Sequence, residues 1–198
     1  NLSWEELKQA LHQKGIYFIG GGSFGEVFTS SKWKYVVKIF EEDNAYLNFV
    51  NYVIKNPSTC FPKFKKQIIK IHQFHTRPSN APKFLYAVRI ERLRDVSNLP
   101  DELKGLLEYM SEDLIDVTRA GMLDFEFELL SGILTTQQIF DKYARFELED
   151  VIKELVKYFD HCTELAPDLH TGNFMLRGNK LICIDPVFDP DIEGAKVI

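Results

Sequence analysis

The stretch Asp168-Leu169-His170-Thr171-Gly172-Asn173, with Leu181-Ile182-Cys183-Ile184-Asp185 a few residues later, decides how the rest of this chain is interpreted. The apolar run before Asp185 predicts a short strand, so residues 174–184 are expected to form a hairpin between Asn173 and Asp185. Each of Asp168, Asn173 and Asp185 alone could be a turn residue, because Asp and Asn favour turns. Placed together around one hairpin, they indicate a shared site.

A carboxylate can orient or deprotonate an acceptor hydroxyl, and an amide with a second carboxylate can hold Mg²⁺ against nucleotide phosphates. The order of Asp168, Asn173 and Asp185 fits these three roles. We therefore predict Asp168 as the catalytic base, and Asn173 and Asp185 as ligands of a Mg²⁺ ion. We expect His170 to be structural or to lie near a phosphate, and we do not assign it the proton transfer.

A glycine-rich segment at residues 20–27 fits the pattern G-x-G-x-x-G-x-V. Glycines let the backbone fold tightly over phosphates and present its N–H groups to them. A dinucleotide-binding fold would place a helix directly after the glycines, whereas Val27-Phe28-Thr29 continues as a strand. A plain glycine turn is the other interpretation. The residues of this segment that we predict to bind ATP are Gly20, Gly21, Gly22, Ser23, Phe24, Gly25 and Val27.

Lys38 stands inside the apolar strand Val36-Val37-Lys38-Ile39. A lysine seldom points into a core without a partner, so it is either an outward-facing strand residue or a ligand of the nucleotide phosphates. Its position 13 residues after Gly25 favours the second interpretation. The helix that follows contains no acid, and we expect Glu42 or Asp43 to pair with Lys38. A simple N-cap role for Asp43 is the open alternative.

The predicted elements change character along the chain. Ser3 and Glu6 form a capping box at the start of a helix that Gly15 ends. The first half otherwise reads as strands with one helix from Asp43 to Ile54, and the strands are expected at Ile16–Ile19, Val27–Phe28, Tyr35–Phe40, Lys66–Phe74 and Phe84–Ile90. The lysines at 63, 65, 66 and 70 are expected to lie on a solvated strand and loop.

Helical spacing dominates after residue 99. Leu103, Leu106, Leu107 and Met110 share one face, and helices are also predicted over Phe125–Leu134 and Leu148–Leu165. The fold class is therefore α+β, with an antiparallel-sheet lobe over about residues 1–92 and a reduced helical lobe over about 93–198.

The composition excludes several classes of protein. Apolar residues make up 45% of the chain and charged residues 27%, which is normal for a globular protein. The net charge of −5 argues against a nucleic-acid partner. No apolar run approaches the ~18 residues that span a bilayer, so no membrane partner is expected. Three widely spread cysteines indicate reduced thiols in the cytoplasm. The sequence leaves the oligomeric state open.

With these motifs the chain resembles the protein-kinase-like superfamily over nearly its whole length. The segments Phe18-Ile19-Gly20-x-Gly22-x-Phe24, Asp168 to Met175 and Asp185-Pro186-Val187 look most like early serine/threonine protein kinases of short-tailed bacteriophages. Minimal kinase effectors of bacterial secretion systems are similar in size and in the Thr-Gly-Asn element. The resemblance implies a two-lobed fold with ATP and Mg²⁺ as cofactors. It also implies that Glu91 and Leu93 lie beside the adenine, although an ordinary sheet edge is the other interpretation of that passage.

The chain also departs from the superfamily. Ala166-Pro167 stands where many protein kinases have His-Arg, and Asp185-Pro186-Val187 replaces Asp-Phe-Gly. Only 13 residues follow Asp185. We therefore expect the usual activation segment and peptide-binding surface to be absent or replaced by residues 99–147.

These observations predict an ATP- and Mg²⁺-dependent kinase that phosphorylates Ser or Thr of a host or partner protein. Two alternatives stay open. A small-molecule, aminoglycoside-type phosphotransferase would share the loop around Asp168, but such enzymes generally carry a large helical C-lobe. A pseudokinase that acts as a docking module is favoured by the missing helix glutamate and opposed by the complete set of Asp168, Asn173 and Asp185.

Overall fold

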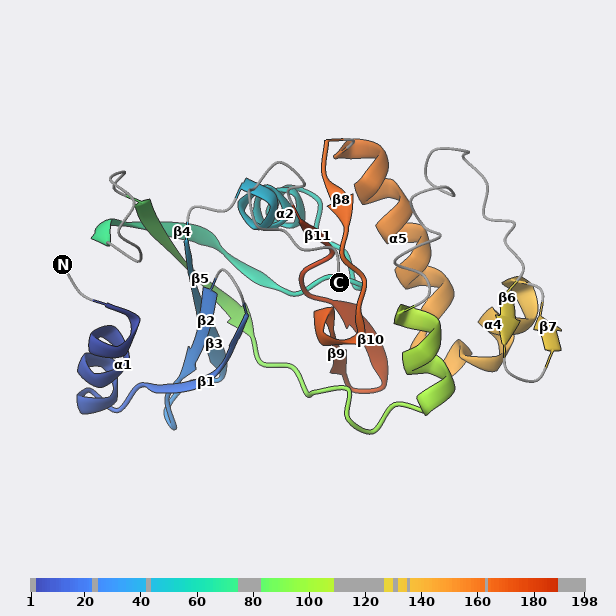
Figure 1. The fold of residues 1–198 in the computed structure, drawn as a ribbon, viewed down its shortest axis with the longest axis horizontal. Coiled ribbons are helices and arrows are strands. Elements are labelled where there is room, and N and C mark those ends of the chain that lie inside the picture. Colours follow the sequence, from blue (N-terminus) through green and yellow to red (C-terminus); the bar gives the residue numbers. More distant parts are fainter. Residues whose placement is uncertain are drawn as a thin grey trace. The chain divides into compact units, whose positions relative to one another are not determined.

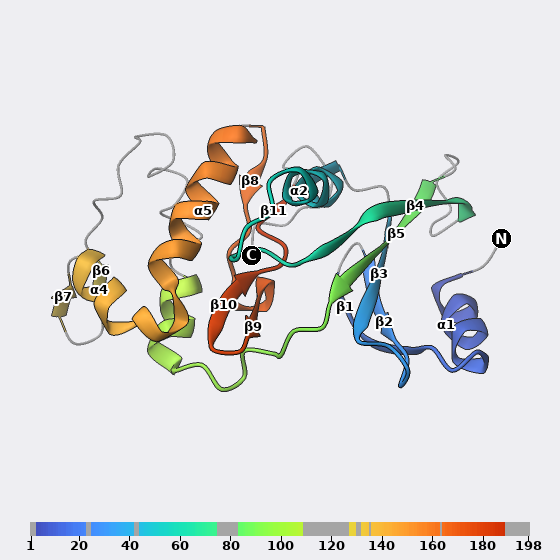
Figure 2. The same cartoon turned by 180° about the vertical axis from the view of Figure 1, so that it is seen from behind.

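A computed structural model describes residues 3–22, 25–41, 44–74, 83–108, 127–129, 132–134, 136–162 and 164–188. The fold is mixed α+β with a five-stranded antiparallel sheet, as the sequence predicts. The chain divides into two compact units (Figures 1 and 2). Unit 1 comprises Asn1–Lys55 and Lys63–Arg92, and unit 2 comprises Asn56–Pro62 and Leu93–Ile198.

Unit 1 is built on the five-stranded sheet. Its strands follow the spatial order β1-β2-β3-β5-β4, and every neighbouring pair is antiparallel. Their bounds are β1 Tyr17–Gly22, β2 Gly25–Thr29, β3 Tyr35–Glu41, β4 Phe64–Phe74 and β5 Lys83–Glu91. The predicted strands are therefore confirmed, and β1 and β4 form the two edges of the sheet.

Helices cover opposite faces of this sheet. Helix α1, Trp4–Gln13, starts with the predicted capping box of Ser3 and Glu6, and its apolar side packs on a core cluster that includes Ile39. The next residue, Phe40, points to the other face because side chains alternate along a strand. There its ring lies 4.8 Å from that of Tyr46 in helix α2, Asn44–Lys55.

Unit 2 is mainly helical in its described part. Residues 101–108 are helical, and the predicted face of Leu103, Leu106 and Leu107 is buried. Its other helices are α4 Thr136–Lys142, the 3-10 turn η1 Ala144–Phe146 and α5 Leu148–His161. The predicted helix from Leu148 is thus confirmed, but it ends at His161 and not at Leu165. Met110 lies outside the described residues.

One predicted helix is wrong. Residues 127–134 contain two short antiparallel strands, β6 Phe127–Leu129 and β7 Gly132–Leu134, where a helical piece over Phe125–Leu134 was expected. Apolar residues and glutamates alternate in Phe125-Glu126-Phe127-Glu128-Leu129, and Ser131-Gly132 follows. Period-two alternation before a glycine is typical of a hairpin, and here it outweighs the helical spacing of the leucines.

Short strands carry the C-terminal part of unit 2. The predicted hairpin is present as β9 Phe174–Arg177 paired with β10 Lys180–Cys183. Helix α5 lies alongside β10 (Figure 1). Two-residue strands β8 Ala166–Pro167 and β11 Val187–Phe188 also pair with each other. No helix in the described parts of the chain is long and apolar enough to cross a membrane.

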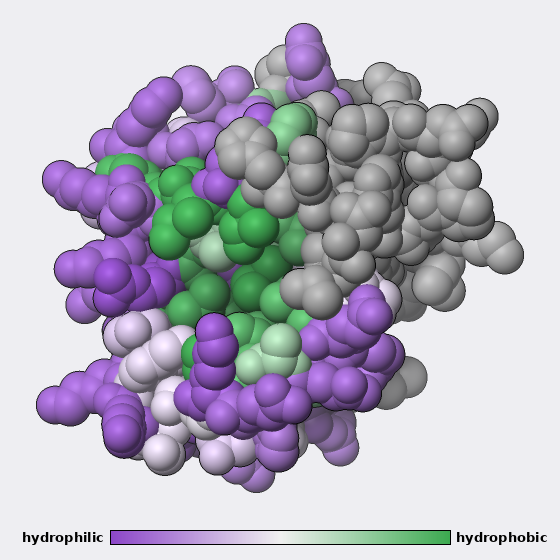
Figure 3. Space-filling model, turned by 90° about the vertical axis from the view of Figure 1, so that its left-hand side faces the viewer, coloured by the Kyte–Doolittle hydropathy of each residue, from purple (hydrophilic) through white to green (hydrophobic). Residues whose placement is uncertain are grey.

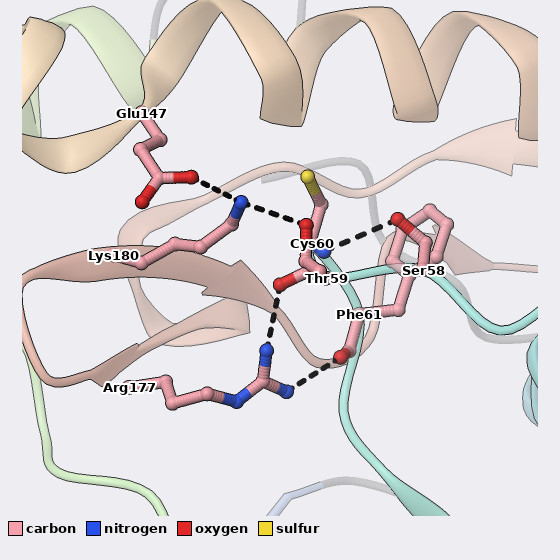
Figure 4. Close-up of polar contacts among 7 residues, drawn as sticks. All are labelled: Ser58, Thr59, Cys60, Phe61, Glu147, Arg177 and Lys180. Carbon is pink, nitrogen blue, oxygen red and sulfur yellow. Dashed lines mark hydrogen bonds and ion pairs between the residues drawn. The ribbon is translucent and has the colours of Figure 1, made fainter.

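Residues 56–62 belong to unit 2 although they lie between α2 and β4 of unit 1 in the sequence. The guanidinium of Arg177 donates to the carbonyl of Thr59 at 2.7 Å and to that of Phe61 at 2.9 Å (Figure 4). Lys180 Nζ donates to Thr59 Oγ1 at 2.8 Å and is also paired with Glu147. Two side chains of the β9–β10 hairpin, Arg177 and Lys180, therefore hold residues 59–61, and Arg177 does so through their backbone carbonyls.

Candidate active site

The glycine-rich segment forms the antiparallel hairpin β1–β2, as predicted, with Gly22 opposite Gly25. A side chain at Gly25 would not fit, because an added Cβ would lie 2.7 Å from Phe40 Cβ and 2.9 Å from the Ile39 carbonyl oxygen. An added Cβ at Gly20 or Gly22 would meet no atom within 4 Å. Ser23 and Phe24 lie outside the described residues.

Lys38 lies in the middle strand of the sheet, β3, directly opposite Val27 of β2 and Val88 of β5. Its side chain is on the α2 face, and Nζ lies 3.4 Å from the centroid of the Tyr46 ring. The first turn of α2 contains no acid. Glu42 and Asp43, the predicted partners, lie outside the described residues, so that prediction stays open.

Glu91 and Leu93 lie at the end of β5 and just beyond it. The backbone of Glu91 donates to the Lys63 carbonyl at 3.1 Å, and its carboxylate accepts from the Lys63 N–H at 2.8 Å. One backbone hydrogen bond and one side-chain hydrogen bond, both to Lys63, thus hold Glu91 at the strand end. The predicted position of Glu91 and Leu93 beside the adenine stays a prediction.

Asp168 follows β8 directly, and its N–H donates to the carbonyl of Pro186 at 2.7 Å. The pairing of Pro167 with Val187 extends this contact along β11. The chain before Asp168 and the chain after Asp185 are therefore held side by side. The Asp168 side chain is 39% exposed, which leaves its carboxylate open to a reactant.

Asn173 completes the arrangement from the 3-10 turn η2, Thr171–Asn173. Its Nδ2 donates to the Asp168 carbonyl at 2.8 Å, and its own carbonyl accepts from Ile184 N–H at 2.8 Å. The side chain is only 9% exposed. Because Nδ2 is committed, the oxygen Oδ1 is the atom of this amide left to accept or to bind a cation.

Asp185 follows Ile184 and therefore lies beside Asn173. The pKa of the buried Cys183 thiol reflects the nearby carboxylates. Burial is the largest cause that raises this pKa, and the charges of Asp185 and Asp168 raise it further. Two independent contacts thus bring the three predicted residues together within unit 2, one through Pro186 and one through Ile184.

His170 makes a contact within its own loop, which agrees with the structural one of the two roles expected of it, while a position near a phosphate stays a prediction. Its Nδ1 accepts from the Gly172 N–H at 3.1 Å, so a neutral ring carries its proton on Nε2, which lies 3.7 Å from Asp168 Oδ1. An added Cβ at Gly172 would lie 2.7 Å from the His170 ring. Glycine at this position therefore allows the ring to close over the loop.

Sequence reasoning missed two residues that contact predicted site residues or their loop, one in each unit. Glu108, in the helix over 101–108, accepts the Thr171 N–H at 2.7 Å through Oε1. Tyr46 lies under the Lys38 ammonium. Neither residue belongs to a motif, and both contacts depend on packing between elements: Tyr46 lies only eight residues after Lys38, whereas Glu108 and Thr171 are 63 residues apart.

An Asn oxygen and an Asp carboxylate suit Mg²⁺, which prefers oxygen ligands and commonly uses one or two carboxylates together with phosphates. The residues present therefore fit the predicted ion. Within the described residues, no group of three or more His, Cys, Asp or Glu side chains is arranged to hold a metal by itself. A metal at Asn173 and Asp185 would thus depend on oxygens of a bound phosphate or water.

No protein-family model matches the chain, and no curated protein matches it. Among solved structures, the chain is similar to a thermostable mutant of aminoglycoside phosphotransferase APH(4)-Ia, crystallised as a ternary complex with ADP and hygromycin B. That match has a TM-score of 0.36 and 15% identity, and it covers 93% of this chain and 73% of that one.

Proposed function

We propose that this chain is an ATP- and Mg²⁺-dependent protein kinase that transfers the γ-phosphate to Ser or Thr of a partner protein. The proposal rests on one observation above all. In unit 2, two backbone hydrogen bonds and one from the Asn173 side chain hold Asp168, Asn173 and the chain around Asp185 in one compact arrangement. A carboxylate, an amide oxygen and a second carboxylate are the groups that phosphoryl transfer requires.

Asp168 acts as the base that orients the acceptor hydroxyl and accepts its proton. Its backbone is fixed on both sides, by Pro186 at its N–H and by Asn173 at its carbonyl. The side chain is therefore presented from a rigid loop while the carboxylate itself stays accessible. His170 Nε2 lies 3.7 Å from Oδ1 of the same carboxylate.

Asn173 Oδ1 and the Asp185 carboxylate hold Mg²⁺, which, when bound, neutralises charge on the nucleotide phosphates. The hydrogen bond from Asn173 Nδ2 to Asp168 fixes the amide so that its oxygen is available. The same bond couples the position of the metal ligand to that of the base.

Unit 1 supplies groups that bind phosphates. The N–H groups of the β1–β2 hairpin and the ammonium of Lys38 are the hydrogen-bond donors to the phosphates. Val27, which we also predict to contact ATP, lies opposite Lys38 and on the same face of the sheet. Little covalent chemistry is left for the protein, so catalysis is mostly positioning and charge neutralisation. A kinase of this type has a kcat of about 1–100 s⁻¹.

The protein acceptor rests on the resemblance of residues 168–175 to phage serine/threonine kinases. Host-cell lysate incubated with labelled ATP and the protein tests it directly. We expect labelled protein bands with wild type, a loss of about 10²–10⁴-fold with Asp168→Ala, and no turnover with Asp185→Ala. Asp160→Ala, an exposed change on α5, is the matched control and should keep full activity.

Each failure has a separate meaning. Label on an added aminoglycoside and on no protein would replace the acceptor by a small molecule. Full transfer by Asp185→Ala would overturn the metal assignment. Absence of any transfer, together with no Mg²⁺-dependent thermal shift on ATP addition, would favour a docking module.

A further inference from the structure

The outer edge of β4 carries a pattern that phosphoryl transfer does not use. β4 is 11 residues long and stands at the end of the sheet. Among the described residues its ladder hydrogen bonds run to β5, on one side only. Over residues 68–71, where the pairing with β5 is regular, the other side therefore presents backbone N–H and C=O groups that can pair with a further strand.

The edge is apolar on one face. Ile69 lies opposite Ala87 and Ile71 opposite Leu85, and both partners belong to the core cluster under α1. Yet Ile69 is 54% exposed and Ile71 is 36% exposed. Figure 3, which views the molecule from the side where Figure 1 draws α1, shows apolar residues gathered in one area that hydrophilic residues border. The two isoleucines thus extend the apolar face of the sheet to an edge where, among the described residues, no further strand pairs with β4.

The edge is basic on the other face. Lys70 alternates with the isoleucines and lies opposite Tyr86, with its Nζ 3.6 Å from the centroid of the Phe84 ring. Lys65 and Lys66 are also exposed, and they lie in the irregular part of β4, where the register with β5 shifts between Phe64 and Ile68. A local cluster of cations in a chain of net charge −5 favours a partner of opposite charge.

We propose that residues 64–71 of β4 bind an extended segment of a partner protein in which acidic and apolar residues alternate. The segment adds to the sheet as a sixth strand and pairs with the free backbone groups of β4. Its apolar residues lie beside Ile69 and Ile71, and its acidic residues lie beside Lys70 on the other face. Opposite charges across strands stabilise such a pair.

A second copy of this chain is a poorer occupant. If two β4 edges paired antiparallel about Lys70, in the regular stretch of the strand, Lys70 of each copy would lie opposite Lys70 of the other. Like charges directly opposite each other destabilise strand pairing. The lysines therefore act against self-association and select for an acidic strand.

Selection from a displayed library of random eight-residue segments tests the proposal. We expect the segments that bind wild type to alternate acidic and apolar residues. Binding should weaken about tenfold in Lys66→Glu/Lys70→Glu, since two cations of this edge become anions that repel an acidic segment, and also in Ile69→Lys. Lys32→Glu/Lys34→Glu, an equal change of charge in the β2–β3 turn, is the control and should bind normally.

Hydrogen exchange then locates the bound segment, with protection expected at residues 64–71. Enrichment without a preference for acidic residues, binding unaffected by the β4 variants, or protection elsewhere would overturn the proposal. Concentration-dependent dimerisation that Ile69→Lys abolishes would assign the edge to a second copy instead. ATP binding by these variants is expected to match wild type, so this test and that of phosphoryl transfer fail separately.

Discussion

At the scale of single residues, the contact between Lys38 and Tyr46 gives the sharpest prediction. A cation over an aromatic face is stabilised by about 0.5–2 kcal/mol, and the Lys38 ammonium lies 3.4 Å from the centroid of this ring. Tyr46→Leu should therefore raise the Kd for ATP about 2- to 30-fold, while Tyr46→Phe keeps the ring and should stay near wild type. Calorimetric titration with ATP measures both.

Tyr52→Leu is a suitable control because it removes a partly exposed ring from the same helix. Equal losses in Tyr46→Phe and Tyr46→Leu would mean that the hydroxyl, not the ring, supports Lys38.

The three buried cysteines predict a fall in stability at alkaline pH. Burial raises the pKa of the thiols of Cys60, Cys162 and Cys183 above their ordinary value. Below pH ~8.5, the thiol pKa in an unfolded chain, both states keep these protons. Above it the unfolded chain loses protons that the folded protein retains, so the free energy of unfolding falls as pH rises. Urea titrations at pH 7 and pH 9.5 measure the difference.

Alkylation provides an independent check. Iodoacetamide should label none of the three thiols of the folded protein and all of them after unfolding. Cys183→Ala should show a smaller fall in stability between the two pH values. An unchanged fall would assign the effect to another group, such as the buried phenol of Tyr158, whose pKa burial also raises.

Which single residues could be predicted depends on whether a sequence pattern marks them. Asp168, Asn173 and Asp185 were found because they flank one hairpin, and that spacing is visible in a sequence. Tyr46 and Glu108 were not, because only the packed structure determines which side chains of a helix reach a neighbouring strand or a distant loop. The acid expected to pair with Lys38 falls outside the described residues.

At the scale of elements, the β1–β2 hairpin depends on Gly25. A Cβ there would overlap Phe40 and the Ile39 carbonyl in the neighbouring strand. Gly25→Ala should therefore cost about 1–3 kcal/mol of stability, as overpacking usually does, and should weaken ATP binding. Gly22→Ala is the matched control because its added Cβ meets nothing within 4 Å. Thermal unfolding with and without ATP compares them, and equal effects would contradict this account.

The helix over 101–108 is tied to the loop of the candidate base through Glu108. Its carboxylate accepts the Thr171 N–H at 2.7 Å, although the contact is exposed and its net contribution is about 1 kcal/mol. Glu108→Ala should lower kcat several-fold while KM for ATP stays unchanged, because the loop and not the phosphate donors is loosened. Glu108→Gln keeps an acceptor oxygen and should restore part of kcat.

Elements with strong local signals were predicted correctly. The capping box places α1, and the glycine pair places the β1–β2 turn. The strands β6 and β7 were mistaken for a helix because apolar residues in 125–134 satisfy both periods, and only the hairpin pairing decides between them. The end of α5 was placed too late because the apolar spacing continues through Leu165 after the backbone has left the helix at His161.

At the scale of the whole molecule, the assignment of residues 56–62 to unit 2 was not visible in the sequence. It depends on Arg177, whose guanidinium satisfies two backbone carbonyls, those of Thr59 and Phe61. Arg177→Ala should cost about 2 kcal/mol of stability. Arg177→Lys should recover only part, since a compact ammonium cannot reproduce the fork of two N–H donors. Urea unfolding measures both, and full recovery by lysine would contradict the two-carbonyl contact.

The same segment has a consequence for how this protein can change over generations. The chain passes from one unit to the other after residues 55, 62 and 92. A recombination event that exchanged residues 93–198 for those of another gene would leave Thr59, Cys60 and Phe61 facing a foreign hairpin. Each unit is compact, yet neither can be inherited as a single uninterrupted piece of coding sequence.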